Sequence, residues 1–200
     1  MISHEHRCIF IHIPRCAGSS IETWIAGDDW WNVNSPTKHI LASQAKLLYA
    51  EYWDSYFKFS IVRNPYTRMS SCLKYDSHFG LSATGGFINF NKYHDLFGHD
   101  VIIEHDHRFY SRENIISPSH SPGLLYGNIL DESLDFVGRF ETLEADMEHV
   151  RRSIGKADPF RFHVEATDKS VIQHRLTQAD REHISLMFKN DFDKYGYAKE

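Results

Sequence analysis

The sequence predicts a three-layer α/β fold, in which a central parallel β-sheet is flanked by helices. Three short apolar runs, rich in β-branched or aromatic residues, have the composition of buried strands and occupy residues 7–13, 57–62 and 136–140. Each run is followed by a turn and then by a helical pattern. Strands that alternate with helices form parallel sheets, because the helix between them carries the chain back across one face of the sheet.

The helical patterns have recognisable beginnings and ends. They occupy residues 21–27, 67–79, 142–155 and 177–195. Ile21, Trp24 and Ile25 give the first pattern one apolar face, and a glycine ends it. Thr142 and Thr177 stand where N-cap residues are found, and Thr177 is followed three residues later by an acidic residue, as in a capping box. The remaining stretch, residues 80–126, is irregular and predicts loops that cover a site.

Length and composition indicate a single domain over residues 1–200. The chain has 200 residues, of which 42% are hydrophobic and 14% aromatic, enough to build a packed core. Its formal net charge of -5 gives no overall positive field, so we expect no nucleic-acid partner. An anionic ligand would therefore need a local group of positive side chains.

Cysteine content and hydropathy indicate a cytoplasmic location. The three cysteines are too few, and odd in number, for a disulfide framework, which favours a reducing compartment. The first seven residues are polar and lack the apolar stretch of a signal peptide. The sequence also has no run of about 18 apolar residues, so we expect no membrane segment.

The turn after the first predicted strand has the composition of an anion-binding loop. Residues 13–20 read Ile-Pro-Arg-Cys-Ala-Gly-Ser-Ser. Small residues let backbone N–H groups surround an anion at a helix N-terminus, Ser19 and Ser20 add hydroxyl donors, and Arg15 adds a positive charge. The alternative is an ordinary strand-to-helix turn with capping serines. A Walker loop is disfavoured, because no lysine precedes the serines.

A second loop follows the next predicted strand. Residues 60–71 read Ser-Ile-Val-Arg-Asn-Pro-Tyr-Thr-Arg-Met-Ser-Ser. Arg63 lies at the carboxyl end of the strand, where open α/β sheets bind ligands, and Ser71 lies in the following helix. The two side chains are placed to converge on one phosphate, with bidentate contacts from the arginine. The alternative is that Arg63 and Arg68 are surface charges.

Together the two loops resemble the sulfotransferase superfamily, in its carbohydrate (heparan/chondroitin-type) branch and its small soluble bacterial-type members. Residues 12–20 resemble the family's 5'-phosphosulfate loop, H-[IV]-P-K-T-A-G-T-[ST], and residues 61–71 its 3'-phosphate motif, [FV]-V-R-[ND]-P-x-x-R-x-x-S. Residues 135–143 and 190–197 resemble two further family segments. The resemblance implies a P-loop-like fold and transfer of a sulfuryl group from 3'-phosphoadenosine 5'-phosphosulfate (PAPS), which leaves 3',5'-adenosine bisphosphate (PAP). It implies no metal.

The resemblance also assigns roles to individual residues. Arg63 and Ser71 would bind the 3'-phosphate, while Arg68 would brace their loop. Arg15 stands where the family has a catalytic lysine; because arginine keeps its proton at neutral pH, its expected role is electrostatic. The full set of expected cofactor-binding residues is Arg15, Cys16, Ala17, Gly18, Ser19, Ser20, Arg63, Ser71 and Lys169.

A base must take the proton of the acceptor hydroxyl. His39 is our first candidate, because a histidine is largely neutral at pH 7 and the segment before the 3'-phosphate strand resembles a family segment that carries a histidine. Glu51 and His78 are the reserve candidates. The acceptor, a carbohydrate or small-molecule hydroxyl, would be shaped by residues 80–126.

Three other interpretations stay open at this point. One is a P-loop-type phosphotransferase or kinase, and another is a non-catalytic adenine-nucleotide-binding module, which Arg15 in place of lysine would suit. The histidines and acidic residues at 99–107 have the right types for a divalent metal but no established ligand spacing, so we expect a polar loop there and no metal site.

Overall fold

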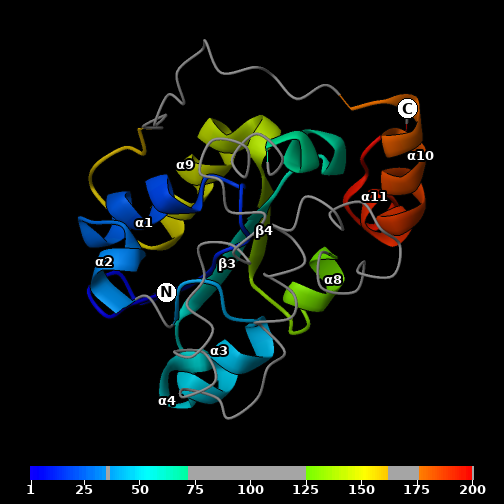
Figure 1. Cartoon of the computed structure of the whole chain (residues 1–200). Coiled ribbons are helices and arrows are strands. Elements are labelled where there is room, and N and C mark those ends of the chain that lie inside the picture. Colours follow the sequence, from blue (N-terminus) through cyan, green and yellow to red (C-terminus); the bar gives the residue numbers. More distant parts are fainter. Residues whose placement is uncertain (35–36, 72–124, 162–175, 200) are drawn as a thin grey trace. The chain divides into compact units, whose positions relative to one another are not determined.

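The computed structural model describes residues 1–34, 37–71, 125–161 and 176–199 (Figure 1). The chain forms two compact units. Unit 1 contains residues Met1–Arg63 and Leu130–Glu165, and unit 2 contains Asn64–Ile129 and Ala166–Glu200. Expected site residues His78 and Lys169, and nearly all of the stretch 80–126, lie outside the described residues.

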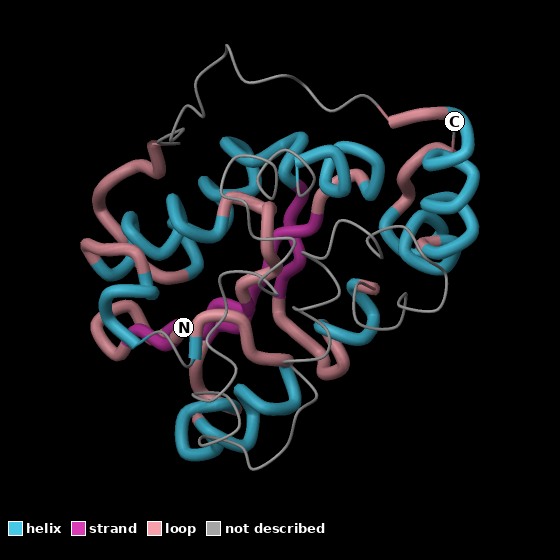
Figure 2. The backbone as a smooth tube through the Cα atoms, viewed as in Figure 1, coloured by secondary structure: helices cyan, strands magenta, loops and turns pink. Residues whose placement is uncertain are grey.

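Unit 1 contains a four-stranded sheet packed against helices, drawn in magenta and cyan in Figure 2. The strands, in spatial order, are β1 (Ile2–Ser3), β2 (Cys8–Ile11), β3 (Phe57–Val62) and β4 (Phe136–Arg139). The three strands expected from sequence pair in parallel, as predicted. The short edge strand β1 pairs antiparallel with β2, so the sheet is mixed but mostly parallel.

The described residues of unit 1 form five α-helices. They are α1 (Gly18–Ala26), α2 (Trp30–Asn34), α3 (Ala42–Leu48), α4 (Ala50–Trp53) and α9 (Leu143–Ser153), with a 3-10 turn at Phe140–Thr142 before α9. Helix α9 packs on β3 and β4 and buries Leu143, Met147 and Val150, which follow its helical period. None of the helices in the described residues is long and apolar enough to cross a membrane.

The core of unit 1 is built on the two central strands. Phe10 and Phe59 are register partners, and their ring centroids lie 5.0 Å apart. Ser60 is also fully buried, and its hydroxyl donates to the carbonyl of Ile11 across the strands at 2.7 Å. Because β2 and β3 are parallel neighbours, the residues that follow each of them emerge at one edge of the sheet.

The ends of two helices differ from the sequence prediction. Helix α1 begins at Gly18 rather than near residue 21, so the three small residues expected in the loop form the first turn of the helix. Trp24 is only half-buried, and Glu22 is buried with Ile21 on the inner face. Thr142 makes no capping bond to the backbone of α9; its hydroxyl donates to Asp146 at 2.7 Å instead.

Unit 2 contains helical residues 65–71, α8 (Tyr126–Ile129), α10 (Gln178–Met187) and α11 (Lys189–Tyr195). The predicted capping box at the start of α10 is confirmed: the Asp180 amide donates to Thr177 Oγ1 at 3.2 Å, and the Thr177 amide donates to Asp180 Oδ2 at 2.8 Å. Ile184, Phe188 and Phe192 are fully buried, as their helical spacing predicts.

Arg68 is fully buried inside unit 2, which excludes a surface charge at this position. Its guanidinium lies over the ring of Tyr126, 4.7 Å from the centroid, and interacts electrostatically with Asp191. The Asp191 carboxylate accepts from the amides of Tyr126 at 2.8 Å and Gly127 at 3.3 Å, the first turn of α8. The expected closing segment at 190–197 therefore contributes an acidic cap to a neighbouring helix.

Candidate anion-binding loop

The loop between β2 and α1 has an unusual backbone. Arg15 and Ala17 both have φ of 66°, in the left-handed region that non-glycine residues seldom adopt, and the Cys16 amide donates to the carbonyl of Ile13 at 3.3 Å. Left-handed residues in a tight turn bring backbone N–H groups to one side, a geometry that binds anions. Such strained residues also concentrate at ligand sites.

Arg63 lies beside this loop. Its Nη1 donates to the carbonyl oxygen of Arg15 at 3.2 Å, and its guanidinium stacks over the ring of Phe140, 4.2 Å from the centroid. The hydrogen bond and the stacking fix the direction of the side chain. Two arginines that the sequence assigned to different loops are therefore brought together at the carboxyl ends of β2 and β3.

Gly18 is needed for packing. A Cβ atom built on Gly18 would lie 1.9 Å from Nε2 of His12, far inside van der Waals contact. The imidazole of His12 therefore lies against the backbone at the start of α1, in space that any side chain at residue 18 would occupy. The small residue that the sequence assigns to anion binding is also required by the histidine beneath it.

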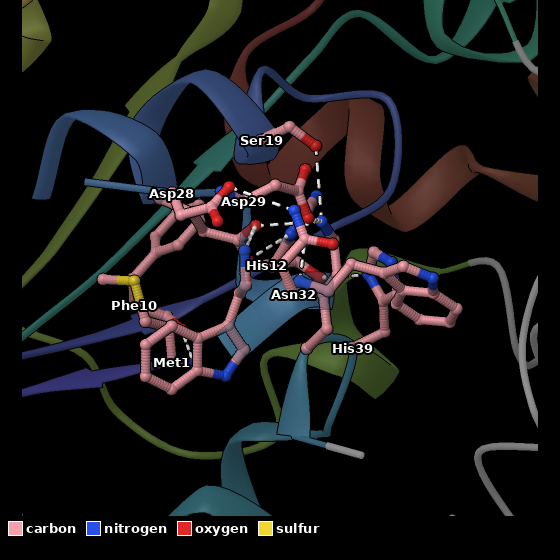
Figure 3. Close-up of polar contacts among 12 residues, drawn as sticks. Met1, Phe10, His12, Ser19, Asp28, Asp29, Asn32 and His39 are labelled. Carbon is pink, nitrogen blue, oxygen red and sulfur yellow. Dashed lines mark hydrogen bonds and ion pairs between the residues drawn. The ribbon is translucent and has the colours of Figure 1, made fainter. Parts of the chain in front are cut away.

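Beneath the loop, His12, Glu22 and Lys38 are buried and lie next to the half-buried Asp29; Figure 3 labels His12 and Asp29 of this group. Glu22, which is 0% exposed, contacts His12 Nδ1 at 2.7 Å through Oε1 and Lys38 Nζ at 3.0 Å through Oε2. Lys38 also forms an ion pair with Asp29 and donates to the hydroxyl of Ser19 at 3.3 Å. We refer to His12, Glu22, Asp29 and Lys38 as the loop cluster.

Burial and charge set the ionisation of the loop cluster. Burial raises the pKa of Glu22, and the neighbouring Lys38 acts against it. Burial would raise the pKa of Asp29 too, but hydrogen bonds from Lys38, Ser19 and the Trp31 amide outweigh it and lower that pKa to about 2. Asp29 is therefore a carboxylate at neutral pH.

The two histidines near the loop are neutral at pH 7. The pKa of His12 lies well below its ordinary value because the ring is buried, and Lys38 adds to the effect. The pKa of His39 is also well below its ordinary value, first through burial and then through His12 and Lys38. In the His39 ring, Nδ1 lies 3.3 Å from the carbonyl oxygen of His12 and donates to it, which makes Nε2 the acceptor atom.

The expected site residues differ in their exposure. Ser19 is exposed, Arg15, Ala17, Ser20 and Arg63 are half-buried, and Gly18 is buried. Cys16 is 1% exposed, with its thiol donating to the carbonyl of Pro14 at 3.7 Å, so any contact it makes with a ligand is through its backbone.

The candidate bases and the remaining 3'-phosphate residue occupy three different settings. His39 is 7% exposed and packs against His12, with ring centroids 4.3 Å apart and the ring planes tilted by 58°. Glu51 is exposed on α4, a helix that follows the residues of the loop cluster in the chain. Ser71 lies in the helix of unit 2, whereas Arg63 belongs to unit 1, so the convergence of these two on one phosphate stays a prediction.

Sequence reasoning missed the loop cluster. Glu22 gave one signal, since it is a lone carboxylate next to Ile21 and Ile25 on a short helix, where burial would demand a cationic partner. Lys38 directly precedes His39, and its sequence context gives no sign that it is buried. Among the described residues, no group of three or more metal-ligating side chains is arranged to hold a metal ion, and the segment 99–107 lies outside them.

Comparisons with models of protein families, with curated proteins and with solved structures found no match to this chain.

Proposed function

We propose that this chain is a PAPS-dependent sulfotransferase that transfers a sulfuryl group to a hydroxyl of a carbohydrate or small-molecule acceptor. One observation carries the proposal: the loop after β2 and Arg63 after β3 meet at one sheet edge, with Arg63 Nη1 3.2 Å from the Arg15 carbonyl oxygen. The first motif and Arg63 of the second are thus neighbours within unit 1. On this proposal the sheet belongs to a three-layer P-loop-like fold.

The chemistry is an in-line displacement at sulfur. The acceptor oxygen forms a bond to sulfur while the bond from sulfur to the 5'-phosphate oxygen breaks, so negative charge collects on that phosphate oxygen of PAP. Arg15 and the backbone amides of residues 17–20 stabilise this charge. Arginine keeps its proton, so its contribution is electrostatic. The reaction needs no metal for this step.

His39 is the proposed general base. It is neutral at pH 7, and its Nδ1–H donates to a carbonyl, so the lone pair for the acceptor's proton is on Nε2, a buried atom that an acceptor reaches through a local rearrangement. The burial that keeps the ring neutral also weakens it as a base, so we expect a contribution near the lower end of the range for general bases, about a hundredfold. A His39→Ala variant that kept turnover within a few-fold of the wild type would contradict the assignment.

One alternative has a specific observation in its favour. Arg15 replaces the lysine of the resembled family, and a module that binds adenine nucleotides without catalysis would tolerate that change. The donor would be bound in the same place, so binding alone does not separate the two functions.

Transfer of radiolabelled sulfate from PAPS to a panel of sugars and phenols tests the proposal. We expect label in at least one acceptor, and a loss of at least about tenfold in Arg63→Ala, which removes the charge beside the loop. Lys46→Met is the matched control, since its ammonium pairs with Glu132 on the surface of unit 1. Donor binding without transfer to any acceptor would favour the non-catalytic module.

A further inference from the structure

The ammonium group of Lys38 is fully engaged by protein partners. Its side chain is 6% exposed and contacts Glu22 Oε2 at 3.0 Å, Ser19 Oγ at 3.3 Å and the carboxylate of Asp29. An ammonium has three hydrogens to donate, and these three acceptors account for them. A lysine held in this way is arranged to orient its neighbours.

Ser19 connects this buried lysine to the exposed loop. It lies in the first turn of α1 and accepts a hydrogen bond from Lys38 at 3.3 Å. Its hydroxyl also helps to lower the pKa of Asp29, so the side chain interacts with two members of the loop cluster. Figure 3 shows Ser19 and Asp29 around the same network of contacts.

Burying these charges is costly unless they are paired. Glu22 is 0% exposed, and it accepts from the Trp30 amide at 3.2 Å besides contacting His12 and Lys38. Removing the lysine would leave one buried carboxylate without its cation, which is strongly unfavourable. The turn that contains Ser19 would then lose the group that ties it to residue 22 and to residue 29.

We propose that Lys38 is a positioning residue, which holds the first turn of α1 in its anion-binding conformation by joining Ser19 to Glu22 and Asp29. It acts through Ser19 and does not touch the donor. The identity of the anion, the 5' end of PAPS, rests on the function proposed above; the positioning itself does not.

Hydrogen exchange of the ligand-free protein tests the positioning directly. In Lys38→Met we expect the Ile21 amide, whose 3.1 Å hydrogen bond to the Ala17 carbonyl closes the first turn, to exchange at least about tenfold faster than in the wild type, because the turn opens locally. Lys46→Met, the surface control, leaves its exchange unchanged. Carbon-13 titration adds a signature that general destabilisation would not give: the Asp29 pKa rises from about 2 toward its ordinary value. Unchanged exchange and an unchanged Asp29 pKa would overturn the proposal.

A double-mutant cycle on PAP affinity tests whether Lys38 acts through Ser19. We expect Lys38→Met and Ser19→Ala each to weaken PAP binding about tenfold relative to the wild type. The double variant should also bind only about tenfold more weakly than the wild type, because both substitutions remove the same contact between Lys38 and Ser19. Lys38→Arg should restore part of the affinity. A double variant weakened by the product of the two effects, about a hundredfold, would show direct contact of Lys38 with the ligand and overturn the proposal.

Two further arrangements keep the result decisive. If circular dichroism shows that Lys38→Met is unfolded, Ser19→Ala replaces it in the exchange experiment, because it removes the bond from Lys38 to the turn and leaves the contacts of Lys38 with Glu22 and Asp29 intact. The exchange outcome is then judged in the same way. If the wild type fails to bind PAP, the proposed function fails, while exchange and the Asp29 titration still decide the role of Lys38.

Discussion

Each of the two units buries charged side chains, but the two clusters end in different places. In unit 2, Arg68 is fully buried, and Asp191 directs both carboxylate oxygens to backbone amides of α8. In unit 1, the loop cluster ends at the hydroxyl of Ser19, an exposed residue of the candidate loop. One cluster joins helices to one another, and the other joins the core to a loop.

This difference separates two uses of a buried charge. A carboxylate that caps a helix is satisfied by groups that are always present, so its contribution is to stability. A network that ends on an exposed serine fixes the geometry of a surface that a ligand meets, so its contribution is also to binding. We therefore expect variants of the unit 2 cluster to change the free energy of unfolding, and variants of the loop cluster to change ligand affinity as well.

The largest effect on stability is expected from Arg68→Met in unit 2. It removes a fully buried cation that lies over the Tyr126 ring and acts on the buried Asp191 carboxylate, and removing one member of a buried charge network costs about 3–5 kcal/mol. The measurement is the free energy of unfolding from urea denaturation. Arg152→Met is the control, because Arg152 is 74% exposed and pairs with Glu148 on the surface, where such a pair contributes about 0–1 kcal/mol. Equal losses in the two variants would contradict the comparison.

Gly18→Ala should come next, with a loss of about 1–3 kcal/mol through overpacking against His12. The same substitution made in a His12→Ala background should cost much less, because the ring that it would strike is gone. Urea denaturation of both single variants and of the double variant measures this coupling. If the losses of the two single variants simply add in the double variant, His12 is not the reason that residue 18 must be glycine.

The pH dependence of stability sharpens the account of unit 1. His12 and His39 have folded-state pKa values well below 6.5. Below about pH 6.5 the unfolded chain binds protons that the folded chain does not bind, so the free energy of unfolding decreases as the pH decreases, by up to about 1.4 kcal/mol per pH unit for each histidine. His39→Gln should reduce the slope of the unfolding free energy against pH by about 0.5 proton at pH 6.5 and about 0.9 proton at pH 5.5. An unchanged slope would mean that the buried ring titrates normally.

The smallest effect is expected from Arg15→Lys. Both residues carry one positive charge, and both meet the same backbone constraint at φ of 66°. If the role of this side chain is electrostatic, sulfate transfer should change by only a few-fold. A gain of more than about tenfold would instead show that the reaction uses a side chain able to release its proton.

The regular elements of the fold could be predicted because their signals are local. The apolar run at 57–62 became β3 with the same bounds, and the capping box at Thr177 starts α10. Gly27 ends α1 in the left-handed conformation that glycine favours, with φ of 83°. Each of these features depends on residues within a few positions of one another.

The loop cluster could not be predicted because its contacts are not local. Lys38 meets Ser19 and Glu22 across 19 and 16 positions in the sequence, and neither a period nor a motif connects them. Within α1, a carboxylate between apolar residues would ordinarily be assigned to solvent. Its burial at 0% exposure becomes intelligible only once His12 and Lys38 are beside it.

Calorimetric titration with PAP and with adenosine 5'-monophosphate, which lacks the 3'-phosphate, tests the central claim that unit 1 holds a PAPS-type donor between its loop and Arg63. The account predicts that the wild type binds PAP at least about tenfold more tightly than the monophosphate, and that Arg63→Ala removes this difference. Failure of the wild type to bind PAP, or equal affinity for the two nucleotides, would contradict the account.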